Sequence, residues 1–250
     1  MFFSPFLRLL FFGILLPGAV MLPSLQALGS PADDATRALA LELQNRYGSL
    51  TSLTFTFDQV TRTGARERTA GGKATFYRYR PVVEEKGEAD APLPEVRNIM
   101  RWDYTEPDTQ IILSDGETLS IYSAKDRQLI RSPASELESD ITYAFFAGKR
   151  GLLDDFEPRP PDDTIVVSHG EKLRALLLVP KTPHNQIRDV QLWVDDAGLI
   201  RHLLIRDHFD SVTELDFTDV RTDTLPPGDR RTMEELTSFF MPPGTEIISR

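Results

Sequence analysis

The sequence predicts an α+β fold, a curled antiparallel half-barrel sheet covered by a lid of short helices. Over most of the chain, apolar residues alternate with polar ones with a period of two, which is typical of strands with one buried face. Short turns join most of these runs, and this favours an antiparallel sheet over β-α-β units. Two segments have helical spacing: residues 31–48, before the first strand, and residues 135–147, between strands. A long antiparallel sheet curls, so we expect these helices to cover its concave side.

The first 29 residues have the layout of a secretory signal peptide. One basic residue, Arg8, precedes an apolar run over residues 9–16, and small residues follow at Ala27 and Gly29. The run is too short to span a bilayer, so we expect cleavage after Gly29 and a periplasmic location, with an uncleaved anchor as the alternative. Residues 30–250 contain no Cys and are long enough to fold by core burial alone, which predicts a single domain without disulfides.

The mature chain is expected to begin with a helix. Pro31 follows Ser30, and the acidic Asp33 and Asp34 occupy the first turn, a pattern typical of a helix start. Apolar residues then recur at every fourth position: Ala35, Leu39, Leu43 and Tyr47. The helix should end near Gly48, and its apolar stripe should pack on the core.

Strands are expected to follow from residue 50 onward. Phe55 and Phe57 alternate with polar residues, and a polar link over residues 63–71 leads into a second strand over residues 73–80. The stretch "RWDYTEPDTQIILSDGETLSIY", residues 101–122, predicts a strand, a proline corner, a second strand, an Asp-Gly turn and a third strand. Later strands are predicted at residues 164–168, 173–179, 188–194, 199–206 and 211–220.

A second amphipathic helix is predicted over residues 135–147. The spacing of four residues recurs at Leu137, Ile141 and Phe145. Residues 151–156 are expected to add a further helical turn before the Pro158–Pro161 break.

Composition and motifs argue against several function classes. Acidic residues outnumber basic ones by 38 to 28, whereas nucleic-acid binding requires a basic surface. The four His residues are scattered without metal-ligand spacing, so we expect no metal and no cofactor. No nucleophile elbow is present, and the protein is not expected to be an enzyme. His208, between Asp207 and Asp210, is the best candidate for a His–carboxylate pair, but a turn between two strands is favoured.

Aromatic side chains gather on individual strand faces. Phe55 and Phe57 are two residues apart, as are Trp102 and Tyr104, so each pair shares one face of its strand. These side chains either fill an ordinary core or line a cavity for acyl chains, whose burial contributes about 0.8 kcal/mol per methylene. Composition alone leaves both interpretations open.

Four motifs can be compared with a known family. They are "SLTFTFDQV", "GGKATFYRYRP", "MRWDYTEPDTQIILSDGETLSIY" and "FFMPPGTEII", of which the third is the most specific. In order and spacing, over nearly the whole mature chain, they resemble the LolA family of periplasmic lipoprotein carrier proteins. Between the second and third motifs lies an insertion over residues 82–98, which is charged, contains Pro and Gly, and is expected to be an exposed loop.

The resemblance implies an open half-barrel with a helical lid over a hydrophobic cavity. Such a protein would be a monomeric chaperone that accepts acylated lipoproteins from an inner-membrane ABC-type release complex and passes them to an outer-membrane lipoprotein receptor. The residues expected to contact acyl chains are Phe55, Phe57, Met100, Trp102, Tyr104, Ile141 and Phe145. Arg80 corresponds to the Arg that latches the lid, and its five hydrogen-bond donors suit that role. The insertion makes Arg97 and Arg101 alternatives.

A lipid-sensing or envelope-stress regulatory module of the same fold is the second hypothesis. Such a module would bind the periplasmic domain of a membrane protein. It is expected to carry a further C-terminal domain after the position of "PPGTEIISR". A dry apolar cavity beneath helix 135–147 would favour the carrier.

Overall fold

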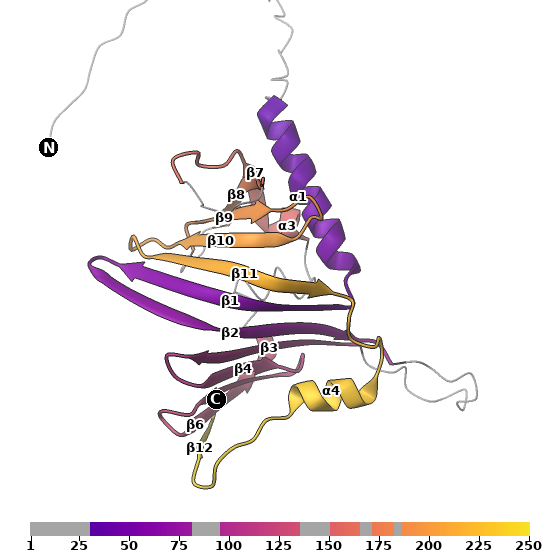
Figure 1. The fold of residues 1–250 in the computed structure, drawn as a ribbon, viewed down its shortest axis with the longest axis vertical. Helices are drawn as coiled ribbons and strands as arrows, with labels where there is room; N and C mark the ends of the chain where they lie inside the picture. Colours follow the sequence, from indigo (N-terminus) through magenta and orange to yellow (C-terminus); the bar gives the residue numbers. More distant parts are fainter. Residues whose placement is uncertain (1–30, 82–95, 136–150, 166–171, 183–186) are drawn as a thin grey trace, which may run out of the picture.

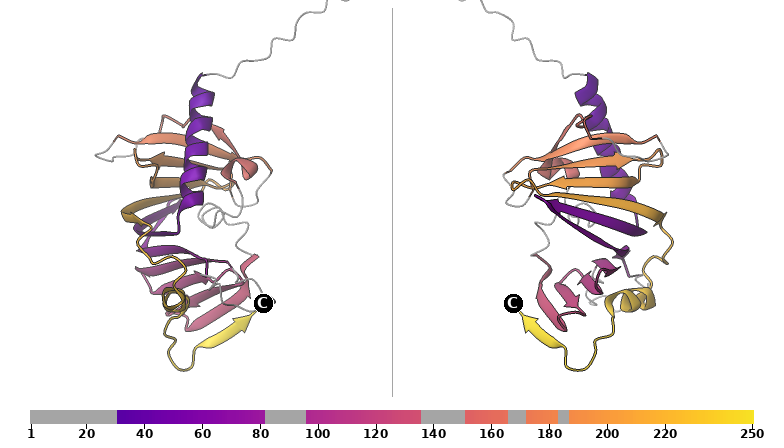
Figure 2. Two further views of the ribbon diagram at one scale, coloured as in Figure 1. Left: turned by 90° about the vertical axis from the view of Figure 1, so that its right-hand side faces the viewer. Right: turned by 60° about the vertical axis from the view of Figure 1, so that its left-hand side comes forward.

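The computed structural model describes residues 31–81, 96–135, 151–165, 172–182 and 187–250. Within these residues, twelve strands form one sheet in the order β12-β6-β5-β4-β3-β2-β1-β11-β10-β9-β8-β7. Every neighbouring pair is antiparallel except β12 and β6, which are parallel. The sheet is open and curled (Figures 1 and 2), and the predicted α+β half-barrel fold is confirmed.

The elements have the following bounds. The strands of the first half of the chain are β1 (Ser52–Thr63), β2 (Arg66–Tyr79), β3 (Arg97–Glu106), β4 (Gln110–Ser114), β5 (Thr118–Ser123) and β6 (Gln128–Pro133). Those of the second half are β7 (Phe156–Arg159), β8 (Arg174–Pro180), β9 (Asp189–Val194), β10 (Ile200–Arg206), β11 (Val212–Thr222) and β12 (Glu246–Ser249). The helices are α1 (Pro31–Ser49), α3 (Leu152–Asp155) and α4 (Arg230–Thr237).

The N-terminal helix forms where the sequence predicts it. Leu39, Leu43 and Tyr47 are buried and join the main core, as the stripe predicts, but Ala35 is exposed. The buried phenol of Tyr47 accepts a hydrogen bond from the backbone N–H of Ile200, at 3.0 Å. This bond ties α1 to the start of β10, and α1 lies beside β7–β11 (Figure 1).

Glycine and aspartate shape the tight turns as predicted. Gly116 has a φ of 96°, a left-handed conformation that other residues rarely adopt. The preceding Asp115 accepts hydrogen bonds on its carboxylate from the N–H groups of Glu117 and Thr118. Gly198, with a φ of 73°, turns the chain between β9 and β10 in the same way.

The predicted polar link over residues 63–71 is wrong in its extent. Thr63 pairs with Arg66, so only Gly64 and Ala65 connect β1 to β2. The hairpin projects beyond the core, and its far residues are exposed. A strand solvated on both faces loses the apolar alternation by which it would be found in the sequence.

Several other boundaries also differ from prediction. Thr164 and Ile165 do not form the start of a strand, because Asp162 binds the backbone and hydroxyl of Thr164 in a turn. Pro158 lies inside β7, which is tolerated because β7 is an edge strand. The helical turn at 151–156 is confirmed as α3, whereas the predicted helix over 135–147 falls almost wholly outside the described residues. Four elements had not been predicted: β6, β7, α4 and β12.

The two faces of the sheet carry different apolar clusters. The face that carries Phe57 and Trp102 is called the inner face. The face that carries Tyr77 and Leu129 is called the outer face. Helices α1 and α3 pack with the inner-face cluster. Helix α4 and the segment after it pack on the outer face of β2–β6. Figure 2 shows α4 outside the curl of the sheet.

Candidate functional site

Five of the seven predicted acyl-contact residues lie together on the inner face. The strand register places Phe57, Gly72 and Tyr104 in one row across β1, β2 and β3. The next row contains Phe55, Ala74 and Trp102, and the third contains Leu53, Phe76 and Met100. Ile141 and Phe145 lie outside the described residues.

Small residues on β2 let the aromatic rings of β1 and β3 meet. The ring centroids of Phe57 and Trp102 are 4.7 Å apart, and those of Phe57 and Tyr104 are 4.9 Å apart. Phe55 lies 5.6 Å from Trp102 in an edge-to-face arrangement. Each such pair contributes about 0.5–1.5 kcal/mol beyond its burial. The result is a continuous aromatic layer, formed by Phe55, Phe57, Trp102 and Tyr104.

Gly72 is required at the centre of this layer. A Cβ atom at Gly72 would lie only 2.0 Å from the backbone oxygen of Asp103. The register of β2 and β3 shifts between Gly71 and Gly72, which is the mark of a β-bulge. The close approach of the two backbones therefore depends on the absence of a side chain.

The chemistry of this face is apolar. Phe57 is fully buried, and Phe55, Met100 and Trp102 are 4–5% exposed. None of the side chains in the three rows carries a charge, and apart from the hydroxyl of Tyr104 they offer dispersion and hydrophobic contact. Such a surface can bind acyl chains but supplies no acid, base or nucleophile.

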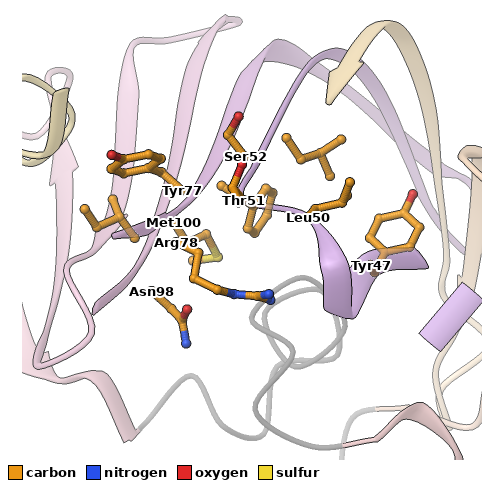
Figure 3. Close-up of a pocket in the computed structure, with 11 residues that line it drawn as sticks. Tyr47, Leu50, Thr51, Ser52, Tyr77, Arg78, Asn98 and Met100 are labelled. Carbon is orange, nitrogen blue, oxygen red and sulfur yellow. The ribbon is translucent and has the colours of Figure 1, made fainter. Parts of the chain in front are cut away.

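A small pocket lies at one end of the inner face, where α1 leads into β1. Its volume is about 20 Å³, room for one or two water molecules rather than for an acyl chain. Figure 3 shows the Arg78 side chain extended along it, near Asn98. The Arg78 guanidinium donates a hydrogen bond to the backbone oxygen of Gly48, near the C-terminus of α1. Burial and the neighbouring Arg80 lower the pKa of Arg78 below its ordinary value.

The Arg residues considered as lid latches occupy three different places. Arg80 is exposed, just beyond the end of β2, and the helix that it would hold lies outside the described residues, so its role as a latch stays a prediction. Arg97 forms an exposed ion pair with Glu117, at 3.1 Å. Arg101 donates to the backbone oxygens of Leu236 and Ser238 at 3.0 and 2.7 Å, on the outer face.

Arg78 was missed in the sequence analysis although a signal was present. Alternate residues of a strand share a face, so Arg78 lies on the same face of β2 as Phe76, two residues before the predicted latch Arg80. Of the two, Arg78 makes the contact with a helix among the described residues. It therefore ties the end of β2 to the C-terminal end of α1.

The segment around His208 forms a turn, as the sequence analysis predicted in preference to a catalytic His–carboxylate pair. Asp207 accepts hydrogen bonds from the N–H groups of Phe209 and Ser211, at 2.7 and 2.8 Å. Although burial alone would raise it, the pKa of Asp207 is lowered overall by these bonds. The described helices include none that is long and apolar enough to cross a membrane.

Comparisons of the sequence with known proteins point to a single family. The sequence profile described as "Outer membrane lipoprotein carrier protein LolA" matches residues 97–229, more than half of the chain. An outer-membrane lipoprotein carrier protein of Nitrosomonas europaea is 28% identical over 149 residues, covering 59% of this chain and 66%, just under two thirds, of the relative. One of Chromobacterium violaceum is 25% identical over 185 residues, covering 72% of this chain and 83% of the relative.

The solved structures to which this chain is similar are more distant in sequence. An uncharacterized conserved protein from Thermus thermophilus is 11% identical with a TM-score of 0.49, covering 86% of this chain and 99% of that chain. A LolA superfamily protein from Nitrosomonas europaea is 14% identical with a TM-score of 0.39, covering 82% of this chain and 97% of that chain.

Proposed function

The chain belongs to the LolA family of outer membrane lipoprotein carrier proteins, and from this premise we propose that it is a periplasmic lipoprotein chaperone. It binds the acyl chains of lipoproteins that an ABC-type complex releases from the inner membrane, and it delivers them to an outer-membrane receptor. The names of the relatives from Nitrosomonas and Chromobacterium support lipoproteins as the cargo.

The single observation that carries the proposal is the uncharged aromatic layer on the inner face. Phe57, Trp102 and Tyr104 come together across Gly72, so that the described part of this face consists of uncharged ring faces and edges. Each methylene that an acyl chain buries against such a surface contributes about 0.8 kcal/mol. Several chains of a lipoprotein together supply enough free energy to hold the cargo out of a membrane without any covalent step.

Cargo binding exchanges one set of apolar contacts for another. Phe55, Phe57 and Trp102 are buried against each other and the surrounding core in this structure. Acyl chains that reach these side chains therefore replace protein contacts, and the net affinity is the difference between the two. This keeps binding reversible, as a carrier that must release its cargo requires.

The two Trp residues allow a direct test, because they lie on opposite faces of the sheet. Trp102 belongs to the aromatic layer, whereas Trp193 lies on the outer face of β9 and packs edge-on against His202. A synthetic lipopeptide with brominated acyl chains quenches Trp fluorescence at contact distance. The variant Trp193→Phe leaves Trp102 as the sole reporter, and Trp102→Phe leaves Trp193.

We expect strong quenching in the Trp193→Phe variant and little in the Trp102→Phe variant, with native mass spectrometry showing that both bind the lipopeptide. Phe at position 102 keeps an aromatic ring in the layer, so binding should persist. Absence of any lipopeptide complex in wild type and both variants would refute the carrier function. Equal quenching of both reporters would move the site away from the inner face.

A further inference from the structure

A second, polar site lies at the end of the inner face opposite to α1. The turns from β3 to β4 and from β5 to β6 border an open groove of about 700 Å³. That volume lies within the range of about 300–1,000 Å³ that small-ligand sites occupy. In Figure 1 these strand ends lie on the left, with the β1–β2 hairpin tip.

The inner face changes from apolar to polar in a single step along the strands. Trp102, Ile112 and Ile121 form one row across β3, β4 and β5. The next row, two residues further along, is Tyr104, Gln110 and Ser123, and all three line the groove. The two rows are about 7 Å apart, because a strand advances about 3.3 Å per residue.

Tyr104 belongs to both surfaces and marks the boundary between them. Its ring is part of the aromatic layer, 4.9 Å from Phe57. Its hydroxyl donates to the side-chain oxygen of Gln59, a groove residue, at 3.2 Å. An aromatic residue with one apolar and one polar end is suited to such a boundary.

Gln110 brings hydrogen-bonding capacity to the groove that the described residues do not use. Its side chain is half-buried on β4, and no described side chain or backbone group bonds to its amide. The charged lining residues carry both signs: Arg68 and Lys125 are basic, and Glu106, Asp108 and Asp126 are acidic. Lys125 pairs with Asp108 at 2.9 Å. A groove of this kind favours a neutral ligand rich in hydrogen-bond acceptors over an ion.

Resting on the proposed carrier function, we propose that this groove binds the polar linkage of the cargo. The linkage consists of the ester and amide carbonyl groups that join the acyl chains to the N-terminal peptide of a lipoprotein. The acyl chains then run from Tyr104 along β3 toward Asn98, a path of about 20 Å at 3.3 Å per residue. This is comparable with the length of an extended long-chain acyl group. The peptide leaves the protein past the β3–β4 turn.

The first test separates the linkage from the chains by comparing two ligands. The variant Gln110→Leu removes an amide at the groove, and Asn45→Leu removes an exposed amide from α1, outside the lining of the groove. We expect Gln110→Leu to weaken lipopeptide binding by about three- to tenfold, the effect of one hydrogen bond. Binding of a free fatty acid of the same chain length should be unchanged, and Asn45→Leu should leave the affinity for lipopeptide unchanged.

A second test needs no loss of affinity and uses the absence of native Cys. Single variants Thr109→Cys, beside the groove, and Asn98→Cys carry a benzophenone label, and the lipopeptide carries biotin on its peptide end. We expect photo-crosslinking to biotinylated fragments of the peptide only from position 109. Crosslinking of the peptide from position 98, or equal effects of both Leu variants on lipopeptide affinity, would overturn the groove assignment and leave the carrier function intact. Failure of the wild type to bind either ligand would overturn both.

Discussion

The rings of Phe57 and Tyr104 lie 4.9 Å apart although their strands are not neighbours in the sheet. Strand β2 runs between them, and at this row it contributes Gly72. The missing side chain leaves room for two rings to meet across a distance of two strand spacings, about 9.5 Å. The aromatic layer is therefore formed by β1, β2 and β3 together, and it depends on Gly72, which contributes no side chain.

Replacement of Gly72 should be among the most damaging single changes in the sheet. In Gly72→Ala the new Cβ would lie 2.0 Å from the backbone oxygen of Asp103, so one strand must move. We expect a loss of at least about 3 kcal/mol in the free energy of unfolding, measured by urea denaturation. Gly48→Ala is the control, because its Cβ meets nothing within 4 Å and α1 favours Ala over Gly. Similar stabilities of the two variants would contradict the bulge geometry.

Loss of the Arg101 side chain should loosen the outer-face helix. Arg101 is 17% exposed and holds the last carbonyls of α4, with Asp103 fixing its other side. We expect Arg101→Leu to cost about 1–3 kcal/mol and to speed hydrogen exchange in residues 229–241. Arg97→Leu, which removes an exposed ion pair, should change stability by less than about 1 kcal/mol. Unchanged exchange in Arg101→Leu would show that α4 is held by its apolar contacts alone.

Removal of the Tyr47 hydroxyl should destabilise the folded protein. Burial raises the pKa of Tyr47 far above its ordinary value, so the phenol stays neutral and accepts from the Ile200 N–H. In Tyr47→Phe this buried N–H loses its partner, and we expect a destabilisation of about 1–3 kcal/mol by thermal or urea unfolding. Tyr79→Phe, at a half-buried position on β2, is the matched control and should be nearly neutral. Equal losses of stability in Tyr47→Phe and Tyr79→Phe would contradict a special role for the Tyr47 hydroxyl.

Asp223 should contribute to stability above pH 4 and lose that contribution in acid. Burial opposes the shift, but hydrogen bonds from Thr51 and Ser52 hold the pKa of Asp223 below its ordinary value. Because the folded-state pKa lies below that of the unfolded chain, about 3.9, the contribution is complete above this pH and falls as pH drops through the folded pKa. The difference in unfolding free energy between wild type and Asp223→Asn should therefore shrink below pH 4.

In that comparison, Asn is a fair replacement because it tolerates the positive φ of 55° at this position. A difference that stays constant between pH 6 and pH 3 would show that the carboxylate charge contributes nothing.

The sequence predicted the apolar parts of the fold better than its polar parts. Phe55, Phe57, Trp102 and Tyr104 share the inner face because strand parity is fixed by the period of two. The length of the β1–β2 hairpin was missed because solvated strand ends have no apolar alternation. Strand β12 was missed because it is four residues long and stabilised by a partner, β6, more than a hundred residues away.

In the candidate site, too, the apolar part could be predicted from the sequence and the polar part could not. The aromatic rows could be predicted from residue type and spacing, whereas the meeting of rings across Gly72 depends on which strands are neighbours. The polar groove could not be predicted, since its lining comes from parts of β1–β5 and two turns whose relative positions depend on how the sheet curls. Similarly, the hydrogen bonds of Arg101 to Leu236 depend on how the C-terminal segment crosses the outer face.

The pairing of β1 with β11 sets the order in which this protein can fold. Leu53 pairs with Thr222, so the central seam of the sheet joins segments from opposite ends of the chain. Loops of this length close slowly, and contacts of high sequence separation slow folding. A ribosome must release almost the whole chain before the seam can form. Until then the two halves of the sheet can pair only as separate hairpin arrays, and the aromatic rows of β1 lack the support of β11.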